Sequence, residues 1–400
     1  MRRKNMLVLR NARLIQELTE GHEDGQGDIV IEDGVIQEIR PAKTVTAPEE
    51  MTMDMTGKTV IPGLIEGHLH LDLCGMDTWE ENVQPDAYRT MRCLRLAQDN
   101  LRMGYTTVRD LGDRNNIVLS VTKGIREGMA VGPDILASGM ILSPTEAGND
   151  FFGGMYTEAD SPDEFTKAVR RQYQLGADWI KIMGTGAIMN PGAVPGTPIL
   201  YEEELQAACR AAAYVGLPVA VHCHGEEGTK MCIRCGVRTV EHASLLDDEC
   251  IRMFKDSEQT FPMLTLSPNV NFLEFSEGKP KHYVEKARKM WERQRESWQA
   301  LREAKVKIGW ATDAGVYEGS HGNGIYEFRA RVNMAGFTPL ECLIQATKNN
   351  SEILMIDDQV GTIACGKRAN LVALEGNPDE NIEVLNQVAL VLKAGQAVQR

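Results

Sequence analysis

Two histidines two positions apart, His68 and His70, follow the apolar run 60–65 and are well placed to bind a metal ion. Residues i and i+2 of a strand point to the same face, so both imidazoles can reach one ion while Leu69 points away. Neutral imidazole is the commonest side-chain ligand for metals near neutral pH. The pair predicts a metal site whose remaining ligands lie elsewhere in the chain.

Further residues of metal-binding type follow other apolar runs, at the ends of predicted strands: Lys181, His222, His224, His242 and Asp313. Five of the residues named so far are suited to direct ligation, which is more than one four-coordinate zinc takes: His68, His70, His222, His242 and Asp313. Two metals ~3.5–4 Å apart would use them all but would need a bridge. A buried ammonium is costly, whereas the neutral amine of Lys181 can capture carbon dioxide. The resulting carbamate is an anion whose two oxygens can span two cations.

The elements that must carry these residues alternate between short apolar runs and helical patterns. We predict eight strands, at 59–67, 106–111, 134–142, 178–183, 218–224, 239–243, 261–267 and 307–312, with helices at 86–103, 161–175, 201–215, 280–303 and 338–349. This alternation favours a parallel sheet with crossover helices. Eight such units predict an α/β fold, a (β/α)8 TIM barrel with its chemistry at the carboxyl ends of the strands. A doubly wound open sheet is the alternative, although neither G-x-G-x-x-G nor a Walker A sequence supports it.

Both ends of the chain consist of short strand-like pieces between turns. Residues 6–14 and 27–39 alternate apolar and polar positions, with a hairpin signal at Glu32-Asp33-Gly34, and 361–363, 370–374 and 388–395 are similar. Chain termini often lie close together. We therefore predict a small β-sandwich domain made of residues 1–58 and 356–400, and a barrel domain made of residues 59–355.

Composition and charge narrow the classes of partner. The chain is 42% hydrophobic and 25% charged, which is typical of a globular protein, and its net charge of -14 argues against nucleic acid and anionic membranes. No stretch approaches the ~18 consecutive apolar residues of a membrane span, and the basic N-terminus lacks the features of a secretory signal. Nine scattered cysteines are typical of reduced thiols, including the pair Cys232 and Cys235. We expect a cytoplasmic protein that acts on a small molecule.

Five segments resemble the amidohydrolase superfamily, and within it the prolidase-like branch of Xaa-Pro dipeptidases and imidazolonepropionase-related enzymes. They are PGLIEGHLH at 62–70, WIKIM at 179–183, VAVH at 219–222, VRTVEHA at 237–243 and ATDAG at 311–315. The segment GTIACGKRANL at 361–371 resembles the closing β-domain of that family. The resemblance covers nearly the whole chain, and the order and spacing of the segments make it specific.

The resemblance implies a hydrolase with two zinc ions. His68, His70 and Asp313 would hold one ion, His222 and His242 the other, and carboxylated Lys181 would bridge both together with a hydroxide. The expected reaction is hydrolysis of an amide bond, in a dipeptide or an N-acyl amino acid. One zinc would polarise the carbonyl, the bridging hydroxide would attack it, and Asp313 would carry the proton to the departing amine. Such barrels often assemble, so we also expect a homo-oligomer.

Substrate contacts are expected in the loops that follow the strands. His224 shares a strand face with His222, and His321 and Tyr326 follow the last strand. Relatives of this branch often carry Gly-Gly-His after the third strand, where this chain has the acidic segment 143–150. Glu146 in that segment favours a polar or cationic substrate group, and a solvated acidic loop is the alternative. The segment 184–198, rich in glycine and proline, is expected to be a further substrate loop.

Three other functions compete with amide hydrolysis. A lactonase or phosphotriesterase-like enzyme would use the same two-metal site. A deaminase or ring-opening hydrolase acting on a heterocycle would use one metal, but superfamily members of that kind generally lack the lysine of the fourth strand. A non-catalytic protein that kept the fold would be expected to have lost ligands, and all six positions are present here.

Overall fold

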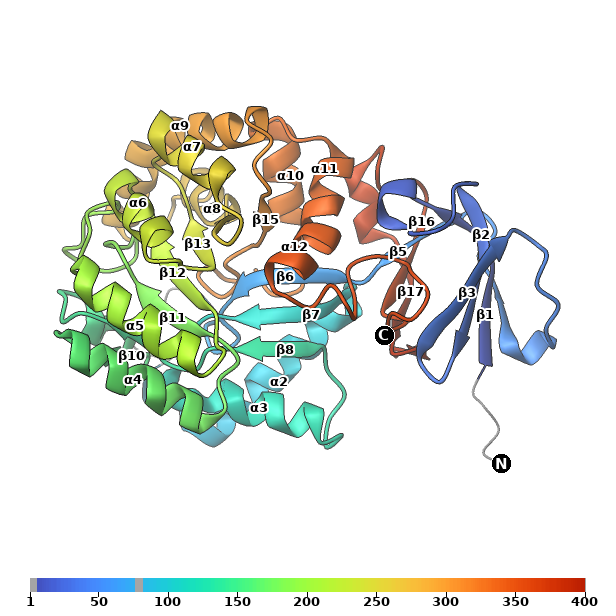
Figure 1. The fold of residues 1–400 in the computed structure, drawn as a ribbon, viewed down its shortest axis with the longest axis horizontal. Helices are drawn as coiled ribbons and strands as arrows, with labels where there is room; N and C mark the ends of the chain where they lie inside the picture. The colour runs from blue at the N-terminus through green and yellow to red at the C-terminus, as the bar shows by residue number, and fades with distance from the viewer. Residues whose placement is uncertain (1–5, 76–81, 400) are drawn as a thin grey trace.

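The computed structural model describes residues 6–75 and 82–399. Figure 1 shows two parts: parallel strands surrounded by helices, and beside them a sheet to which both ends of the described chain contribute. The chain has an α/β fold with parallel sheets. The ranges predicted for the helices and for most strands agree with the observed elements to within a few residues.

The sheet formed by the two chain ends has the strand order β18-β17-β16-β5-β1-β2-β3, with β4 paired to β1. Its strands are β1 (Met6–Leu14), β2 (Gln26–Glu32), β3 (Val35–Pro41), β4 (Thr52–Asp54), β5 (Lys58–Pro62), β16 (Leu371–Glu375), β17 (Val388–Lys393) and β18 (Gln396–Ala397). Asp33 and Gly34 have φ values of 49° and 83° and close the predicted hairpin between β2 and β3. These strands form one continuous hydrogen-bonded sheet, because β5 pairs with β1 on one side and with β16 on the other. Its inner face has an apolar core of its own that includes Leu9, Ile31 and Leu371.

The run 59–67, predicted as one strand, is two strands in two different sheets. Residues Lys58–Pro62 form β5 of the terminal sheet, and Leu64–Leu69 form β6 of a parallel sheet. The break falls at Gly63, where an added Cβ would lie 2.1 Å from Thr106 Oγ1. Only a residue without a side chain fits this close approach. Gly63 is thus the point at which the chain passes from the terminal sheet to the parallel strands.

The parallel strands form two hydrogen-bonded sheets, one with the order β6-β7-β8 and one with the order β10-β9-β11-β12-β13-β14-β15. Their bounds are β6 (Leu64–Leu69), β7 (Tyr105–Asp110), β8 (Asp134–Ala137), β9 (Ile141–Ser143), β10 (Tyr156–Glu158), β11 (Ile180–Met183), β12 (Val219–Cys223), β13 (Thr239–His242), β14 (Phe261–Leu264) and β15 (Gly309–Trp310). Backbone hydrogen bonds also join both edge strands of the shorter sheet to residues that flank strands of the longer one. Asp313 N donates to His68 O (2.8 Å), and Asp178 N donates to Ala137 O (2.8 Å). Both edges of the β6-β7-β8 sheet therefore face the longer one.

Helices cover the outside of the parallel strands (Figure 1). They are α2 (Asp86–Arg102), α3 (Ile117–Arg126), α4 (Pro162–Leu175), α5 (Glu202–Tyr214), α6 (Glu226–Arg234), α7 (Asp248–Asp256), α8 (Ser267–Glu274), α9 (Lys281–Glu303), α10 (Ile325–Met334), α11 (Pro339–Ile344) and α12 (Asn350–Ile353). Side-chain caps begin α4 and α11: the side chains of Ser161 and Thr338 accept hydrogen bonds from Glu164 N and Glu341 N. The predicted strand 261–267 ends at Leu264, and Ser267 begins α8.

Helix α9 brings several side chains to the carboxyl ends of the parallel strands. Its buried residues include Tyr283, Ala287, Met290, Gln294 and Leu301, at intervals of three, four and seven positions. This spacing places them on one helical face, which packs inward while Arg and Glu side chains face solvent. Two residues of α9, Lys286 and Gln294, are important for the site described below.

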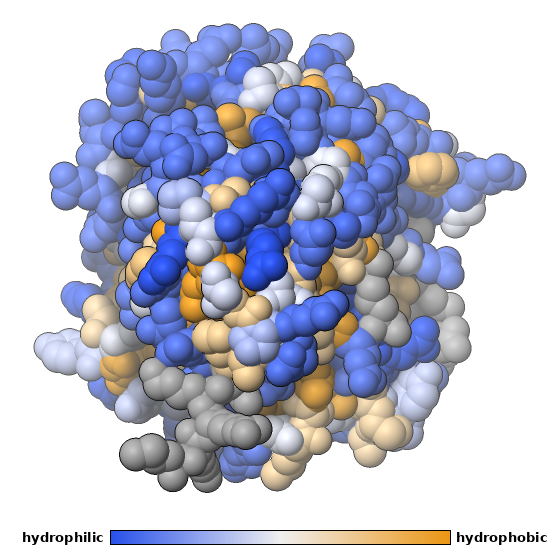
Figure 2. All heavy atoms as spheres, turned by 90° about the vertical axis from the view of Figure 1, so that its right-hand side faces the viewer, coloured by the Kyte–Doolittle hydropathy of each residue, from blue (hydrophilic) through white to orange (hydrophobic). Residues whose placement is uncertain are grey.

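In the described residues, no helix is long and apolar enough to cross a membrane. Figure 2 shows the end of the molecule that bears the terminal sheet, where hydrophilic side chains cover most of the visible surface and hydrophobic ones lie among them. Most of the apolar side chains pack between the parallel strands and the helices, in a core that includes Leu101, Ile180, Val221 and Trp298.

Candidate active site

A single pocket contains all six residues predicted as metal ligands, namely His68, His70, Lys181, His222, His242 and Asp313. It lies where the parallel strands end and holds about 720 Å³ of atom-free space, its open mouth included.

Three of these side chains bring one ligand atom each to a common point. His68 Nε2 and His70 Nε2 are 3.4 Å apart, and Asp313 Oδ1 lies 3.5 Å from the first and 3.4 Å from the second. Two ligands bound ~2.0–2.1 Å from a tetrahedral zinc are separated by ~3.3–3.4 Å. The three atoms thus have the separation that ligands of one ion require.

Hydrogen bonds on the far side of each ring fix which nitrogen faces that point. His70 Nδ1 lies 2.9 Å from Gly112 O, and His68 Nδ1 lies 2.8 Å from Glu241 Oε2. Both oxygens can only accept, so each neutral ring carries its proton on Nδ1 and exposes a lone pair on Nε2. Asp313 Oδ1 is buried and has no hydrogen-bond partner among the described residues. Three converging lone pairs repel one another unless a cation lies between them, so these residues fit a divalent metal.

Glu241 is a buried residue that the sequence analysis did not single out. Its Oε1 accepts hydrogen bonds from Arg109 Nη2 (2.9 Å) and Thr239 Oγ1 (2.5 Å), while its Oε2 orients His68. Arg109 is itself fully buried over the Trp179 ring. A carboxylate that orients a histidine ligand also increases the basicity of that ligand. Glu241 could have been identified from the sequence, because it is a charged residue inside the strand predicted at 239–243.

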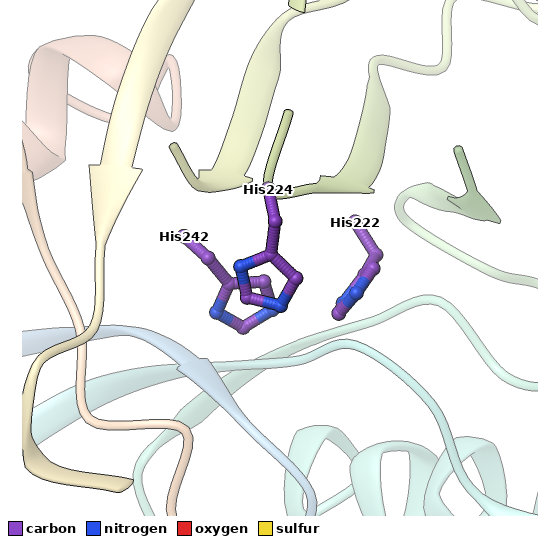
Figure 3. A group of neighbouring side chains, drawn as sticks. All are labelled: His222, His224 and His242. Carbon is purple, nitrogen blue, oxygen red and sulfur yellow. The ribbon is translucent and has the colours of Figure 1, made fainter. Parts of the chain in front are cut away.

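A second group consists of three histidines from neighbouring strands, His222, His224 and His242 (Figure 3). The rings of His224 and His242 are stacked with centroids 4.9 Å apart, and the ring of His222 meets both nearly edge-on at 4.7 and 4.6 Å. One ligand atom of each lies within 4.8 Å of the others. His222 and His224 come from the end of β12, and His242 from the end of β13.

The second group also has ring nitrogens available for a ligand. His242 Nδ1 is 2.6 Å from Thr265 Oγ1, and His224 Nδ1 is 3.0 Å from Ser244 Oγ. His222 hydrogen-bonds to the Gly186 backbone, and its Nε2 is buried without a partner among the described residues. Burial lowers the pKa of His222 and His242 well below the ordinary range and that of His224 to about 4. Neutral imidazoles of this kind have lone pairs that could bind a metal ion.

Unusual backbone conformations occur at two of the predicted ligands. His242 and Asp313 have φ values of 71° and 55°, a region that residues other than glycine seldom occupy. Each of these conformations costs about 1–3 kcal/mol and persists only where the surrounding structure imposes it. Their occurrence at strand ends that face the same pocket is typical of functional sites.

Lys181 is 2% exposed, and its side-chain amine makes no hydrogen bond or ion pair with any residue that the structure describes. Burial lowers the pKa of its amine to about 8, against the opposing charges of Glu241 and Asp313. Burial is the largest cause of the lowered pKa of His68, His222 and His242. The charge of Lys181 is a further cause for each of them. The amine thus lies beside both groups of histidines.

Of the four residues predicted to contact substrate, only His224 lines the pocket. His321 donates from Nε2 to Leu73 O (2.9 Å), and the Tyr326 hydroxyl donates to Glu274 (2.7 Å). Glu146 is half-buried outside the lining, and burial raises the pKa of its carboxyl.

Five polar residues of the pocket lining were not predicted individually from the sequence: Tyr156, Asn190, Thr265, Asn269 and Gln294. Asn190 lies in the segment 184–198 that was expected to contact substrate. Thr265 follows β14, and Asn269 and Gln294 come from α8 and α9. Helical residues carry no strand-end signal in the sequence, so their presence at the pocket was not predictable from it.

Comparisons with known proteins agree with this geometry. The model of the amidohydrolase family matches residues 59–398. The chain is 28% identical over 370 residues to ochratoxinase of Aspergillus niger, covering 84% of this chain and 75% of that protein. Among solved structures it resembles a prolidase complexed with N-methylphosphonate-L-proline (29% identity, TM-score 0.88, 99% and 100% covered) and a Xaa-Pro dipeptidase with bound methionine (28%, TM-score 0.89, 99% and 100%).

The family match covers most of the chain and includes all six predicted ligands. The structural likeness extends over almost its whole length. Together with the metal-binding geometry, these findings show that the chain is a hydrolase that acts on C–N bonds and belongs to the amidohydrolase family.

Proposed function

We propose that this protein is a binuclear metal-dependent amidohydrolase that cleaves an amide bond of a small substrate, a dipeptide or an N-acyl amino acid. The observation that carries the proposal is the convergence of lone pairs from His68, His70 and Asp313 beside a second histidine group. Lys181 lies in the same pocket as both groups.

The donor set favours two zinc ions and their division into two sites. His68, His70 and Asp313 would hold one ion, and His222 and His242 the other. Carboxylated Lys181 would bridge them, because its buried amine has a lowered pKa and is free to react with carbon dioxide. His224 would contact the substrate, since the hydrogen bond with Ser244 leaves its other nitrogen available.

The metals, when bound, would polarise the scissile carbonyl and acidify the attacking water. Asp313 would accept the proton of that water and deliver it to the departing amine. Glu241 would hold the ring of His68 in the required tautomer and orientation throughout.

Two findings support the choice of an amide substrate. The chain resembles a Xaa-Pro dipeptidase and ochratoxinase at similar identity over most of its length. Lys181, suited to bridging two metals, counts against a one-metal deaminase. A lactonase or phosphotriesterase-like activity would use the same site and is included in the test below.

The fold proposed for this activity is a (β/α)8 barrel. Both edges of the β6-β7-β8 sheet carry hydrogen bonds to residues beside the longer sheet, which supports closure of the strands into one barrel. We further propose two domains, expected from the sequence as residues 59–355 for the barrel and 1–58 with 356–400 for the terminal sheet. Because β5 (Lys58–Pro62) pairs within the terminal sheet, we place the first boundary at Gly63 instead of residue 58. The nine free cysteines support a reducing, cytoplasmic setting, and we expect a homo-oligomer.

The test combines metal analysis with a substrate panel. Zinc-loaded protein is expected to hold two ions per chain and to release amino acids from dipeptides or N-acyl amino acids. One ion per chain, or cleavage of lactones or phosphotriesters in preference to every amide tested, would contradict the proposal.

A further inference from the structure

A chain of buried side chains connects two helices to the ring of His224. Asn269 Nδ2 of α8 donates to Gln294 Oε1 of α9 (2.6 Å), and Gln294 Nε2 donates to Ser244 Oγ (3.2 Å). The same hydroxyl lies 3.0 Å from His224 Nδ1. All four residues are at most 5% exposed, and Asn269, Gln294 and His224 line the pocket. Of the four, only His224 has a role in the proposed function.

The direction of these hydrogen bonds determines which nitrogen of His224 carries the proton. Ser244 Oγ accepts from Gln294, so its own hydrogen points away from that amide. Two acceptors are within reach of this hydrogen, His224 Nδ1 at 3.0 Å and the carbonyl of His242 at 3.5 Å, and the shorter distance favours the ring. A ring nitrogen that accepts a hydrogen bond bears no proton, so neutral His224 carries its proton on Nε2.

This tautomer distinguishes His224 from the neighbouring rings. A metal ligand needs a lone pair on the nitrogen that faces the ion, whereas Nε2–H of His224 is a hydrogen-bond donor. The ring of His224 lies over that of His242 (Figure 3), with the ring centroids 4.9 Å apart. The donor is thus beside the candidate ligands of the second ion. Under the proposed function, an oxygen of a substrate bound at the metals is the acceptor that this donor requires.

The donor and the helix that orients it are both held in place. His224 N donates to Thr185 Oγ1 (3.1 Å), which fixes the backbone of the histidine. Helix α9, which carries Gln294, is anchored to the pocket wall by Lys286, whose ammonium donates to three backbone carbonyls of the loop 184–198 at 2.9–3.2 Å. A donor fixed in this way binds an acceptor without first losing conformational freedom.

We propose that three residues, Asn269, Gln294 and Ser244, are positioning residues that act through His224. They fix the ring of His224 as a donor from Nε2–H to an oxygen of the substrate. The inference rests on the proposed amide hydrolysis and deepens it, because it assigns His224 to the substrate and not to the second metal ion. The acceptor is either the carbonyl oxygen of the scissile bond or a carboxylate oxygen, and the third experiment below separates the two.

The first experiment determines the protonated nitrogen directly. In zinc-loaded full-length protein labelled with ¹⁵N-histidine, the NMR signals of His224 are those absent from His224→Phe. Nε2 is expected to have the chemical shift of a protonated nitrogen, and Nδ1 that of an unprotonated one. The reverse pattern would overturn the inference. The measurement does not depend on catalysis, so failure to cleave any amide would contradict the proposed function without changing this result.

The second experiment asks whether Gln294 acts through His224. Gln294→Met removes the donor to Ser244 at similar side-chain size, and it is expected to raise KM about tenfold at similar kcat and zinc content. In a protein that already carries His224→Phe, the same substitution should change KM less than about twofold. An equal increase in both backgrounds would show a structural role only and overturn the inference.

Gln172→Met is the matched control for this comparison. Gln172 is a buried glutamine on helix α4 and does not line the pocket. Its substitution should leave KM unchanged with His224 and with His224→Phe.

The third experiment separates the two acceptors through inhibition by a product. The amino acid released from the carboxyl side of a cleaved dipeptide has the carboxylate but lacks the amide carbonyl. If the carboxylate accepts, Gln294→Met should raise the inhibition constant of this amino acid about tenfold, as it raises KM. If the carbonyl accepts, the inhibition constant should stay the same while KM rises. A KM that does not rise would overturn the inference for both acceptors.

Discussion

The ring of His68 is joined to the carboxylate of Glu241 by a 2.8 Å hydrogen bond from Nδ1 to Oε2, beneath the first group of candidate ligands. Glu241 is in turn fixed by Arg109 and Thr239, so the orientation of a predicted metal ligand depends on three residues outside the pocket lining. Arg109 also donates to the backbone of Gly67, next to His68. This network gives the first prediction.

Glu241→Gln is expected to weaken zinc binding about 10–100-fold, because the amide orients His68 without its negative charge and leaves Arg109 unpaired. Zinc affinity is measured by competition with a chelator. Glu327→Gln is the matched control, since Glu327 is also fully buried and paired with an arginine, Arg331. The control should lower the unfolding temperature but not zinc affinity, and a Glu241→Gln variant with unchanged affinity would refute this role.

Asp313→Asn should reduce kcat by a factor of about 10²–10⁴, the usual contribution of a positioned proton-transfer group. The amide keeps the shape of the side chain, so the far-ultraviolet circular dichroism spectrum should be unchanged. Asp357→Asn, at an exposed position, should retain full activity. Activity of Asp313→Asn close to that of the unmodified protein would show that another group transfers the proton.

Carboxylation of Lys181 should depend on pH in a defined direction. Its folded-state pKa of about 8 lies below the ordinary 10.5, so the reactive neutral amine makes up about a tenth of the protein at pH 7 and most of it above pH 9. At equal concentrations of dissolved ¹³C-labelled carbon dioxide, reconstitution of metal-free protein with zinc should thus be faster at pH 8.5 than at pH 6.5. The carbamate signal in the ¹³C NMR spectrum should be absent from Lys181→Met. A signal that persists in that variant would place the carbamate elsewhere.

His224 shares a cluster with two predicted ligands, and its role can be separated from theirs. As a substrate contact, His224→Phe should raise KM about tenfold or more while two zinc ions remain bound. His242→Phe should instead lose zinc. If His224→Phe also binds less zinc, then His224 is a ligand of the second ion.

Strand-end residues were predictable because their signal is local. An apolar run followed by histidine or aspartate places that side chain at the end of a parallel strand, and this held for His68, His222, His242 and Asp313. The loops after the strands were less predictable, because their path is set by long-range hydrogen bonds. His321 was expected at the pocket, but its ring is bonded to the carbonyl of Leu73.

Other parts of the fold required information that the sequence pattern lacks. Helix α3 was not predicted: it begins after Asn115 and Asn116, both with positive φ, and has no side-chain cap, so its apolar start resembles a strand. Gln294 lies on the buried face of α9. The spacing of buried residues along a helix does not show whether that face packs against the core or lines a pocket. Asn190 was visible only as a polar residue in a glycine-rich loop.

The most direct test of the two-metal account is a crystal structure of the zinc-loaded protein with anomalous scattering data at the zinc edge. The account predicts two anomalous peaks ~3.5–4 Å apart, one bound by His68, His70 and Asp313 and one bound by His222 and His242, with carboxylated Lys181 between them. A single peak, or a second ion without contact to Lys181, would contradict it.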